Sequence, residues 1–261
     1  CRYVWIACVS QMLDTINNTP ARSFASIVTA GPFTRGTARS LGVMLANRLD
    51  ASRPVLLDEW TDTASAELAK MQADYHWSWA LCYFLTHNRN YATSMRHLGR
   101  QYLEKDRGNF REHFGRVARR MEFEFAQFLA HVQPGFRADL CTWDWETRWT
   151  PLAAGSHSTR RIHARRGYQA TGVEIEAGRT YTFSATGTWS IGKAECDADG
   201  LDGMGLLQAA VLDGLKLSAP FPLGSAGDFI ASGSGNLYVR CSEAWHQLAD
   251  NSGSVTLRIE R

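Results

Sequence analysis

The sequence predicts an α+β protein of two domains, in which an N-terminal helical unit is followed by a C-terminal antiparallel β-sandwich. Two observations lead to this fold class. Apolar residues recur every three or four positions from about residue 62 to about residue 130, whereas they alternate with polar residues toward the C-terminus. The charge also changes: residues 1–165 hold 21 Lys and Arg against 15 Asp and Glu, and residues 166–261 hold 7 against 11, which by subtraction gives +6 and −4.

With 261 residues, 44% of them hydrophobic, the chain can bury the cores of two ordinary domains. We expect a helical domain over 1–140, the C-terminal part of a larger truncated domain, then a Trp-rich and basic linker over 141–166 and a β-sandwich over 167–261. The chain starts at Cys1 and has no run of eighteen apolar residues. We therefore expect no membrane span, and a secreted or extracytoplasmic protein whose signal precedes Cys1.

Three amphipathic helices are predicted in the first domain. Each has an apolar stripe at helical spacing, and Pro134 with Gly135 ends the last one. The predicted ranges are 62–87, 91–104 and 110–130.

Two strands flanking a loop are predicted in the last 26 residues, 236–261. The apolar residues alternate with polar neighbours, so each strand would bury one face and turn the other to water. These residues are Leu237, Val239 and Cys241 in the first strand and Val255, Leu257 and Ile259 in the second.

The loop between these strands is rich in side-chain oxygens. Glu243, Asp250, Asn251 and Ser252 supply them, and Gly253 lets the backbone turn. Calcium takes six to eight oxygen ligands of this mixed kind. An ordinary polar turn is the alternative, since such clusters also form turns in β proteins.

From Gly167 to Arg261 the chain resembles the PA-IL-like bacterial lectins, small β-sandwich domains that hold galactose through a bound calcium ion. The matching segments are VEIEAGRTYTFSATGTWSIG (173–192), LLQAAVLDG (206–214) and DNSGSVTLRI (250–259). The resemblance implies a lectin-like or galactose-binding-like fold, and a calcium-dependent carbohydrate-binding module attached to the helical domain.

The resemblance also implies a ligand set. By position, the calcium ligands are the side chains of Glu243, Asp250 and Asn251 and the main-chain carbonyls of Gln247 and Ile191. Sugar contacts fall on Glu243, Asp250 and Gln247. The family has Asp at the position of Glu243 and Asn at that of Asp250, and both replacements keep oxygen donors.

One part of the family's sugar site is missing. The family uses a His and a Gln from the loop after the tryptophan turn, and neither occurs in CDADGLDGMG (196–205). A carbohydrate partner is therefore expected, while a galactose-like hexose is only one of the candidates.

Residues 60–135 resemble, more loosely, the helical C-terminal part of a bacterial gluzincin-like peptidase family. The match covers 75–103 and 110–129. In such enzymes a zinc site on an earlier helix does the chemistry. This chain has no H-E-x-x-H motif, so no catalytic residue is assigned and zinc is expected only if a motif lies before Cys1. A secreted metallopeptidase with the sandwich as its targeting domain is thus an alternative function, and whether the protein is an enzyme stays open.

Other features leave further alternatives. The basic segments RVARR (116–120) and RRIHARR (160–166) have no accompanying base-stacking motif, so we expect no nucleic-acid partner. The tryptophans in 141–149 are expected to dock on the helices, with a sugar-stacking platform as the alternative. A disulfide between Cys196 and Cys241 is an open alternative in an oxidising compartment. A third function is a metal-free structural or adhesion sandwich. The oligomeric state is not predicted.

Overall fold

The computed structural model describes residues 78–105 and 109–261, which belong to two compact units. The first unit contains 78–86, 94–105 and 109–116 of the described residues, and the second contains 87–93 and 117–261. The expected helix over 62–87 is therefore described only from residue 78 onward. Among the described helices, none is both long and apolar enough to cross a membrane.

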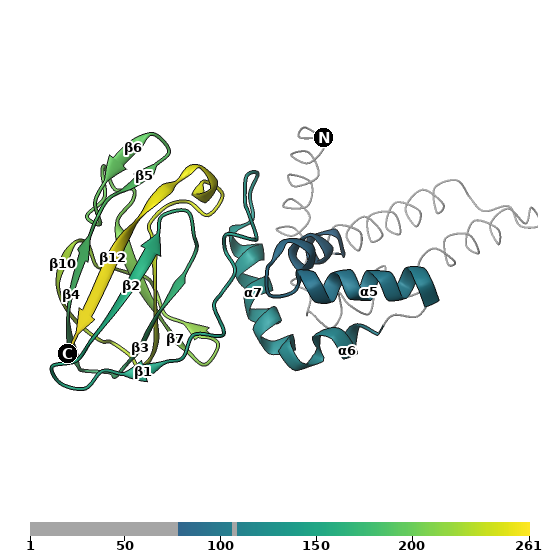
Figure 1. Ribbon diagram of the computed structural model, residues 1–261, viewed down its shortest axis with the longest axis horizontal. Helices are drawn as coiled ribbons and strands as arrows, with labels where there is room; N and C mark the ends of the chain where they lie inside the picture. Colours follow the sequence, from purple (N-terminus) through teal and green to yellow (C-terminus); the bar gives the residue numbers. More distant parts are fainter. Residues whose placement is uncertain (1–77, 106–108) are drawn as a thin grey trace, which may run out of the picture. The chain divides into compact units, whose positions relative to one another are not determined.

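The first unit is helical. Residues 78–87 are helical, and α5 (Ala92–Lys105) and α6 (Phe110–Phe114) follow (Figure 1). Asn109 caps α6, since its side chain accepts a hydrogen bond from the Arg111 amide at 3.1 Å and donates one to Glu112 at 2.7 Å. The buried apolar side chains of this unit include Leu81, Phe84, Leu85, Leu98 and Phe114.

The predicted single helix over 110–130 is interrupted in the structure. A short 3-10 helix, η1 (Gly115–Val117), separates α6 from α7 (Ala118–His131). Glycine is a poor helix former, and Val117 has a φ of −108°, outside the α-helical region. The interruption lies where the chain passes from the first unit to the second.

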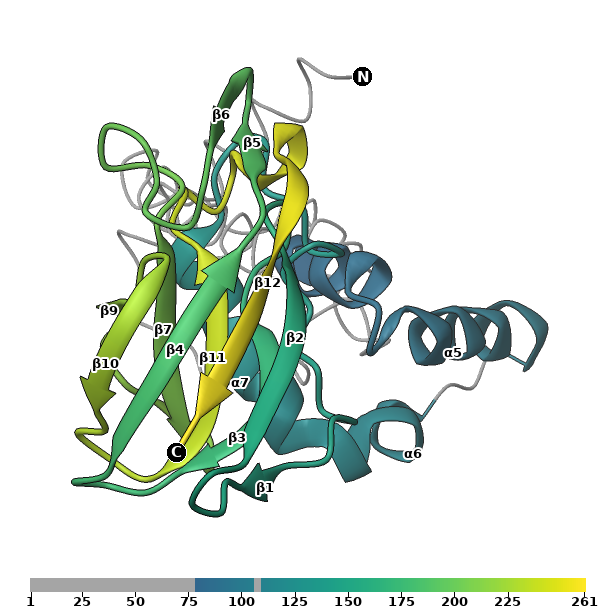
Figure 2. The ribbon, with the colours of Figure 1, turned by 60° about the vertical axis from the view of Figure 1, so that its left-hand side comes forward.

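The second unit is built on two six-stranded sheets (Figures 1 and 2). In the first sheet the order is β1 (Thr150–Pro151), β3 (Gln169–Ile175), β11 (Gly235–Cys241), β7 (Leu207–Asp213) and β8 (Lys216–Leu217), with β9 (Phe221–Pro222) also on β7. In the second it is β10 (Ala226–Ile230), β4 (Thr180–Thr186), β12 (Ser252–Glu260), β5 (Trp189–Ile191) and β6 (Ala194–Cys196), with β2 (His157–His163) also on β12. All the pairings are antiparallel except that of β1 with β3.

The main core lies between the two sheets. Val255, Leu257 and Ile259 of β12 are buried while Thr256 and Arg258 are exposed, so the alternation predicted for this strand is confirmed. Burying one such side chain contributes about 1.5–3 kcal/mol. Opposite them, the first sheet contributes buried residues that include Val173, Ile175, Val211, Leu237 and Val239.

The sandwich begins earlier than residue 167. β2 pairs with β12 from His163 opposite Ser254 to His157 opposite Glu260, so these residues form a strand where the sequence predicts a linker. Ile162, 1% exposed, is the buried apolar residue of β2. With so few apolar residues in the strand, its alternation does not show in the sequence.

The outer face of β11 does not meet water, and that prediction is wrong. Tyr238 is 1% exposed and Arg240 is 3% exposed. A second cluster covers this face, because Phe123 of α7 contacts Trp143 at 4.9 Å between ring centroids and Trp143 contacts Tyr238 at 4.7 Å. The expected docking of tryptophans on a helix is confirmed here. Trp143, at 2% exposed, cannot act as an open sugar-stacking platform.

A buried carboxylate joins the segments that form this cover. Glu124 of α7 is 2% exposed, and both of its oxygens accept hydrogen bonds. The donors are the side chains of Asn88 (2.7 Å), Asn90 (2.8 Å), Tyr91 (2.7 Å) and Trp145 (2.7 Å) and the Trp143 amide (3.3 Å). The turn at 88–91, α7 and the tryptophan segment are therefore fixed to one another.

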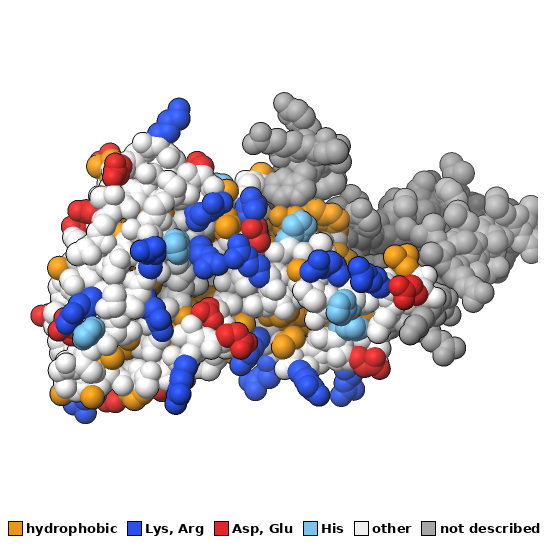
Figure 3. Space-filling view, viewed as in Figure 1, with side chains coloured by type: hydrophobic (Ala, Val, Ile, Leu, Met, Phe, Trp, Pro, Cys, Tyr) orange, Lys and Arg blue, Asp and Glu red, His pale blue; other side chains and the backbone are white. Residues whose placement is uncertain are grey.

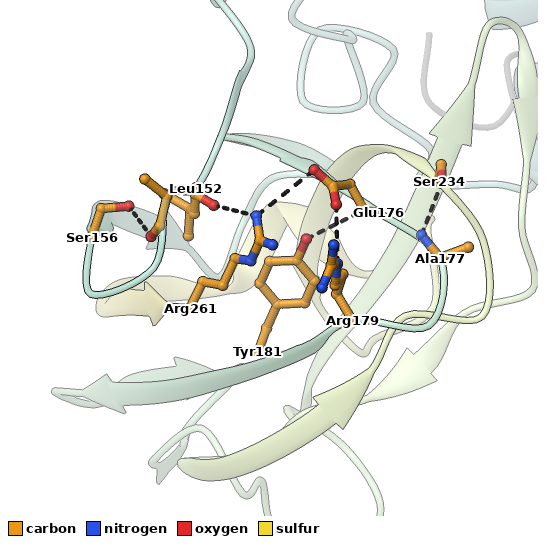
Figure 4. Close-up of polar contacts among 9 residues, drawn as sticks. Leu152, Ser156, Glu176, Ala177, Arg179, Tyr181, Ser234 and Arg261 are labelled. Atoms are coloured by element: carbon orange, nitrogen blue, oxygen red, sulfur yellow. Dashed lines mark hydrogen bonds and ion pairs between the residues drawn. The ribbon is translucent and has the colours of Figure 1, made fainter.

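Polar contacts close one end of the sandwich (Figure 4). The guanidinium of Arg261 donates to the Leu152 carbonyl at 2.9 Å and lies 3.7 Å from Glu176. Glu176 also pairs with Arg179 at 3.2 Å, and its amide donates to the Tyr181 hydroxyl at 2.9 Å. Exposed ion pairs of this kind contribute less than about 1 kcal/mol each, so they fix the β3–β4 turn more than they stabilise the fold.

The thiols of Cys196 and Cys241 are both free and both lie in the main core, so the structure contains no disulfide between them. Burial raises the pKa of Cys241 to about 12. The thiol form is therefore favoured at neutral pH.

Replacing Glu124 tests the buried network. We expect Glu124→Ala to lower the free energy of unfolding by about 3 kcal/mol or more, because several buried donors lose their acceptor at once. Urea unfolding measures the change. Glu122→Ala, an exposed glutamate of the same helix, is the matched control and should stay within about 0.5 kcal/mol of the unmodified protein. Equal effects of the two substitutions would contradict the network's role.

The burial of His131 against the outer face of β11 can be tested through the pH dependence of the free energy of unfolding. Its ring stacks on Trp245 at 4.7 Å between centroids, with 14° between the ring planes. Burial first, and then the charge of Arg240, lower the pKa of His131 from its ordinary value of 6.5. The folded state thus binds fewer protons than the unfolded state just below that pH, so the free energy of unfolding falls as the pH drops through this range.

We expect His131→Gln to reduce this acid-induced fall, since the substitution removes the group that the unfolded state protonates more readily. Urea unfolding at about pH 7.5 and about pH 5 measures it. His157→Gln, at an exposed histidine of β2, serves as the control. His163, whose pKa is also lowered by burial and by Arg166 and Arg161, accounts for a remaining part of the fall. An unchanged difference between the two pH values in His131→Gln would refute this explanation.

Candidate functional site

The predicted calcium loop approaches β5 at the start of β12. Ser252 pairs with Ser190 and Gly253 pairs with Trp189. Gly253 has a φ of +80°, and a Cβ there would lie 2.9 Å from Trp189 Cα and 3.0 Å from the Thr188 carbonyl oxygen. Only glycine allows this approach.

This pairing brings three of the five predicted ligands together. The Gly192 amide donates a hydrogen bond to Asn251 Oδ1 at 3.3 Å. Asp250 Oδ2 lies 3.6 Å from the position that a Cβ on Gly192 would take. Asp250 and Asn251 are therefore beside the peptide that joins Ile191 to Gly192.

The direction of that peptide matters for the Ile191 carbonyl. The carbonyl and the amide of a trans peptide point in opposite directions, and the described residues contain no cis peptide. Since the Gly192 amide points at Asn251 Oδ1, the Ile191 carbonyl is directed away from that oxygen. Both oxygens can bind one cation only after this peptide rotates. Gly192, with a φ of +58°, leaves the backbone free to do so.

The other two predicted ligands lie in the segment between β11 and η2 (Leu248–Asp250). Glu243 is half-buried, and its Oε1 accepts a hydrogen bond from the Ala244 amide at 3.1 Å. Gln247 is exposed. Its main-chain amide donates a hydrogen bond to the Ala244 carbonyl at 2.9 Å, which closes a turn. In the part of the chain that the structure describes, no hydrogen bond joins Glu243 to Asp250 or Asn251.

Two buried polar atoms of the predicted ligands lack partners. Glu243 Oε2 and Asn251 Nδ2 are buried, and neither forms a hydrogen bond among residues 78–105 and 109–261. Such an atom costs about 1–3 kcal/mol when it is left unpaired, and most buried polar groups in proteins have a partner. A cation would satisfy the carboxylate oxygen, and a hydroxyl oxygen would satisfy the amide nitrogen.

The metal would depend on neutral oxygens as well as on charge. Across the described residues, no group of three or more His, Cys, Asp and Glu side chains is placed to hold a metal ion. The predicted set has only two carboxylates, Glu243 and Asp250. The amide oxygen of Asn251, carbonyls and water would have to complete the coordination, a mixture that suits calcium and not the nitrogen and sulfur ligands of zinc.

Arg240 is a site residue that sequence reasoning missed. Its Nε donates to the Cys241 carbonyl at 2.9 Å and its Nη2 donates to the Glu243 carbonyl, while its guanidinium lies 4.2 Å from the Trp245 ring centroid. Burial lowers its pKa. A buried arginine thus holds the start of the segment that carries Glu243. In the sequence, a charged residue between Val239 and Cys241 indicates a solvent-facing strand position, so no signal identified it.

The loop over 196–205 plays a structural part. Asp199 accepts hydrogen bonds from the Ser225 amide, at 2.7 Å, and from the Ser225 hydroxyl, and these bonds lower the pKa of its carboxyl. Gly205 packs under Ile191, because a Cβ there would lie 2.9 Å from Ile191 Cγ1. The loop therefore packs against β5 at Ile191, next to the candidate site.

No protein-family model matches the chain, and no curated protein matches it. Among solved structures, the N-terminal domain of EclA, described as a PllA-like lectin, is 23% identical over 40% of this chain and 95% of its own, with a TM-score of 0.34. Two structures of a functionally unknown conserved protein from Bacillus anthracis str. Ames, one of them a mutant, are 12% and 13% identical over 41% of this chain, with TM-scores of 0.26. The match spans 21% of the length of each Bacillus anthracis chain. The peptidase alternative stays a prediction.

Proposed function

We propose that the segment from Glu243 to Asn251, with the neighbouring turn after β5, binds calcium and through it a carbohydrate. The observation that carries the proposal is the pair of buried atoms without partners, Glu243 Oε2 and Asn251 Nδ2, on two of the predicted ligands. The approach of Asp250 and Asn251 to Gly192 supports it, as does the resemblance of the sequence to the PA-IL-like lectins.

Each residue has a distinct role in this proposal. Glu243 and Asp250 balance the charge of the ion, and Asn251 and the carbonyls of Gln247 and Ile191 supply neutral oxygens. A bound calcium ion supplies a centre to which two neighbouring sugar hydroxyls can bind. Rotation of the peptide between Ile191 and Gly192 accompanies binding, because the Ile191 carbonyl otherwise faces away.

The sugar is held by exposed groups of the same loop. Asp250 and Gln247 are exposed, so a hexose lying over the ion can reach both of them. Glu243, Asp250 and Gln247 then accept or donate hydrogen bonds to its hydroxyl groups. No bond of the sugar is broken, and the protein acts as a binding module.

Calcium dependence is tested on the full chain by its melting temperature in calcium and in excess chelator. At about a hundredfold excess over Kd the ion should add about 2.7 kcal/mol to the free energy of unfolding. We expect Asp250→Ala to abolish this chelator-reversible rise, because one of the two charged ligands is lost. Asp228→Ala, at an exposed aspartate of β10, should leave the rise intact.

The same preparations are then applied to a glycan array, with calcium and with chelator, and binding should appear only in calcium. If calcium does not stabilise the unmodified protein, the metal-free structural sandwich replaces this proposal. If Asp250→Ala retains the full rise, the ion binds elsewhere in the chain.

Arg240 should act as a positioning residue for the calcium loop. We expect Arg240→Met to weaken calcium binding by about tenfold or more, because the Glu243 carbonyl loses a charge-assisted hydrogen bond worth about 1.5–3 kcal/mol. Calorimetric titration with calcium measures Kd, and circular dichroism verifies that the variant is folded. Arg258→Met, at an exposed arginine of β12, is the control. A folded Arg240→Met protein with unchanged Kd would show that the guanidinium does not position the loop.

A further inference from the structure

A pocket of about 410 Å³ opens on the sandwich unit, and none of the five predicted calcium ligands lines it. Three stretches of the chain form its walls: the turn at 89–90, the segment over 140–147 and the residues from 160 to 170. The charged and titratable side chains in its lining are Arg89, Asp144, Arg160, Arg161, His163, Arg166 and Tyr168. Figure 3 shows several Lys and Arg side chains and a histidine gathered on the face over the end of β2.

Positive charge in the pocket is not balanced. Four arginines face one aspartate, an excess of three positive charges. Arg160 is partly engaged, since it donates to the Thr171 carbonyl at 3.2 Å and interacts with Asp144. Arg89, Arg161 and Arg166 form no salt bridge with any residue that the structure describes.

Two acidic groups interact with arginines of the pocket, Asp144 with Arg160 and Asp139 with Arg89, and both already have other partners. Asp144 accepts hydrogen bonds from the amides of Glu146 and Thr147, both at 3.0 Å, and Asp139 pairs with Arg137 at 2.8 Å. Burial, followed by the charges of Arg166 and Arg161, lowers the pKa of His163. An excess of like charges destabilises the folded state, so an anion entering this pocket would relieve part of a repulsion that already exists.

The backbone that carries the arginines is fixed before any ligand binds. The Arg89 amide donates to Thr142 Oγ1 at 3.3 Å, and the adjacent Asn90 side chain donates to Glu124 at 2.8 Å and to the Trp143 carbonyl at 2.9 Å.

On the opposite wall, β2 is anchored at its end. The Gln169 side chain accepts a hydrogen bond from the His163 amide at 2.9 Å and donates one to the His163 carbonyl at 3.0 Å. Arg161 is paired opposite Thr256 in the sheet. Such preorganisation lowers the entropy cost of binding.

We propose that this pocket binds a single oxyanion group, a sulfate ester, phosphate ester or carboxylate, carried by a molecule of about the size of a sugar. Guanidinium groups form paired hydrogen bonds with these planar or tetrahedral anions. The pocket volume lies within the range of small-molecule sites, about 300–1,000 Å³. Single-stranded nucleic acid fits less well, because it needs accessible aromatic faces for base stacking, and the lining rings of Trp143 and Tyr168 are only 2% and 6% exposed.

The test is calorimetric titration of the full chain, in chelator so that calcium plays no part, with a hexose 6-sulfate, a hexose 6-phosphate, a hexuronate and the neutral hexose. We expect at least one acidic sugar to bind and the neutral hexose not to bind. The strongest binder identifies which oxyanion the pocket takes. Arg161→Gln/Arg166→Gln should weaken that binding by at least about tenfold, since charge-assisted hydrogen bonds are lost.

Arg89→Gln, on the other wall, should also weaken binding, and it keeps the test decisive if the double variant fails to fold. Arg148→Gln/Arg165→Gln is the matched control. It removes two charges at exposed arginines near the pocket that do not line it, and it should bind as the unmodified protein does. The proposal is overturned if no acidic sugar binds at millimolar concentration, or if the control loses as much affinity as the pocket variants. Tighter binding of an oligonucleotide, weakened equally by all these substitutions, would indicate a nonspecific basic surface and would also overturn it.

Discussion

The carboxylate of Glu124 is the constraint on which the second unit depends. Taking a charged carboxylate out of water costs several kcal/mol, and the cost is offset only when the oxygens are fully used by hydrogen bonds. Here the donors come from the turn at 88–91 and from Trp143 and Trp145, which lie outside α7 and 19 to 36 residues from Glu124 in the sequence. Moving any one of these segments would leave part of the carboxylate unpaired, so all of them are held at the first sheet together.

Helix α7 and the tryptophan segment cover the outer face of the first sheet, and this cover allows a charged side chain to be buried there. A strand with one face in water could not bury Arg240. On β11 the outer face is buried at Tyr238 and Arg240, and the inner face is buried at Leu237 and Val239. The cost of the buried cation is offset by two carbonyls and by the rings of Trp245 and Tyr168. The position of the Glu243 carbonyl therefore follows from the helix and tryptophans that exclude water from this face.

The spacing of apolar residues in the sequence predicts those helices and buried strand faces that depend on residues close together in the chain. The positions of the helix over 92–105 and the buried face of β12 could be read because apolar residues repeat at the spacing of their own element. Strand β2 could not be predicted in this way, because Ile162 is its only buried apolar residue and one such residue shows no alternation. The outer face of β11 could not either, because its cover comes from Phe123 and Trp143, about a hundred residues earlier.

The candidate site also has features that the sequence predicts and features that depend on tertiary structure. Asp250 and Asn251 lie next to each other in the sequence, and the lectin resemblance places the Ile191 carbonyl beside them, which the pairing of β12 with β5 permits. The direction of the peptide after Ile191 and the role of Arg240 depend on tertiary structure, so no local pattern could reveal them. The arginine-lined pocket was equally hidden, because RRIHARR supplies only one wall and Arg89 comes from a turn some seventy residues earlier.

The two candidate sites share a backbone but not their charged side chains. β12 pairs with β5 at Ser252 and Gly253 and with β2 from Ser254 onward, and the Gly253 carbonyl accepts a hydrogen bond from the Ala164 amide at 3.3 Å. A side chain at Gly253 would thus disturb the predicted calcium loop and the strand that carries Arg161 at the same time. In the two proposals, carboxylates would bind the calcium ion and the guanidinium groups of the pocket would bind the oxyanion, on different segments. Substitutions that change only charge can therefore separate the two proposed activities, whereas substitutions in the shared backbone cannot.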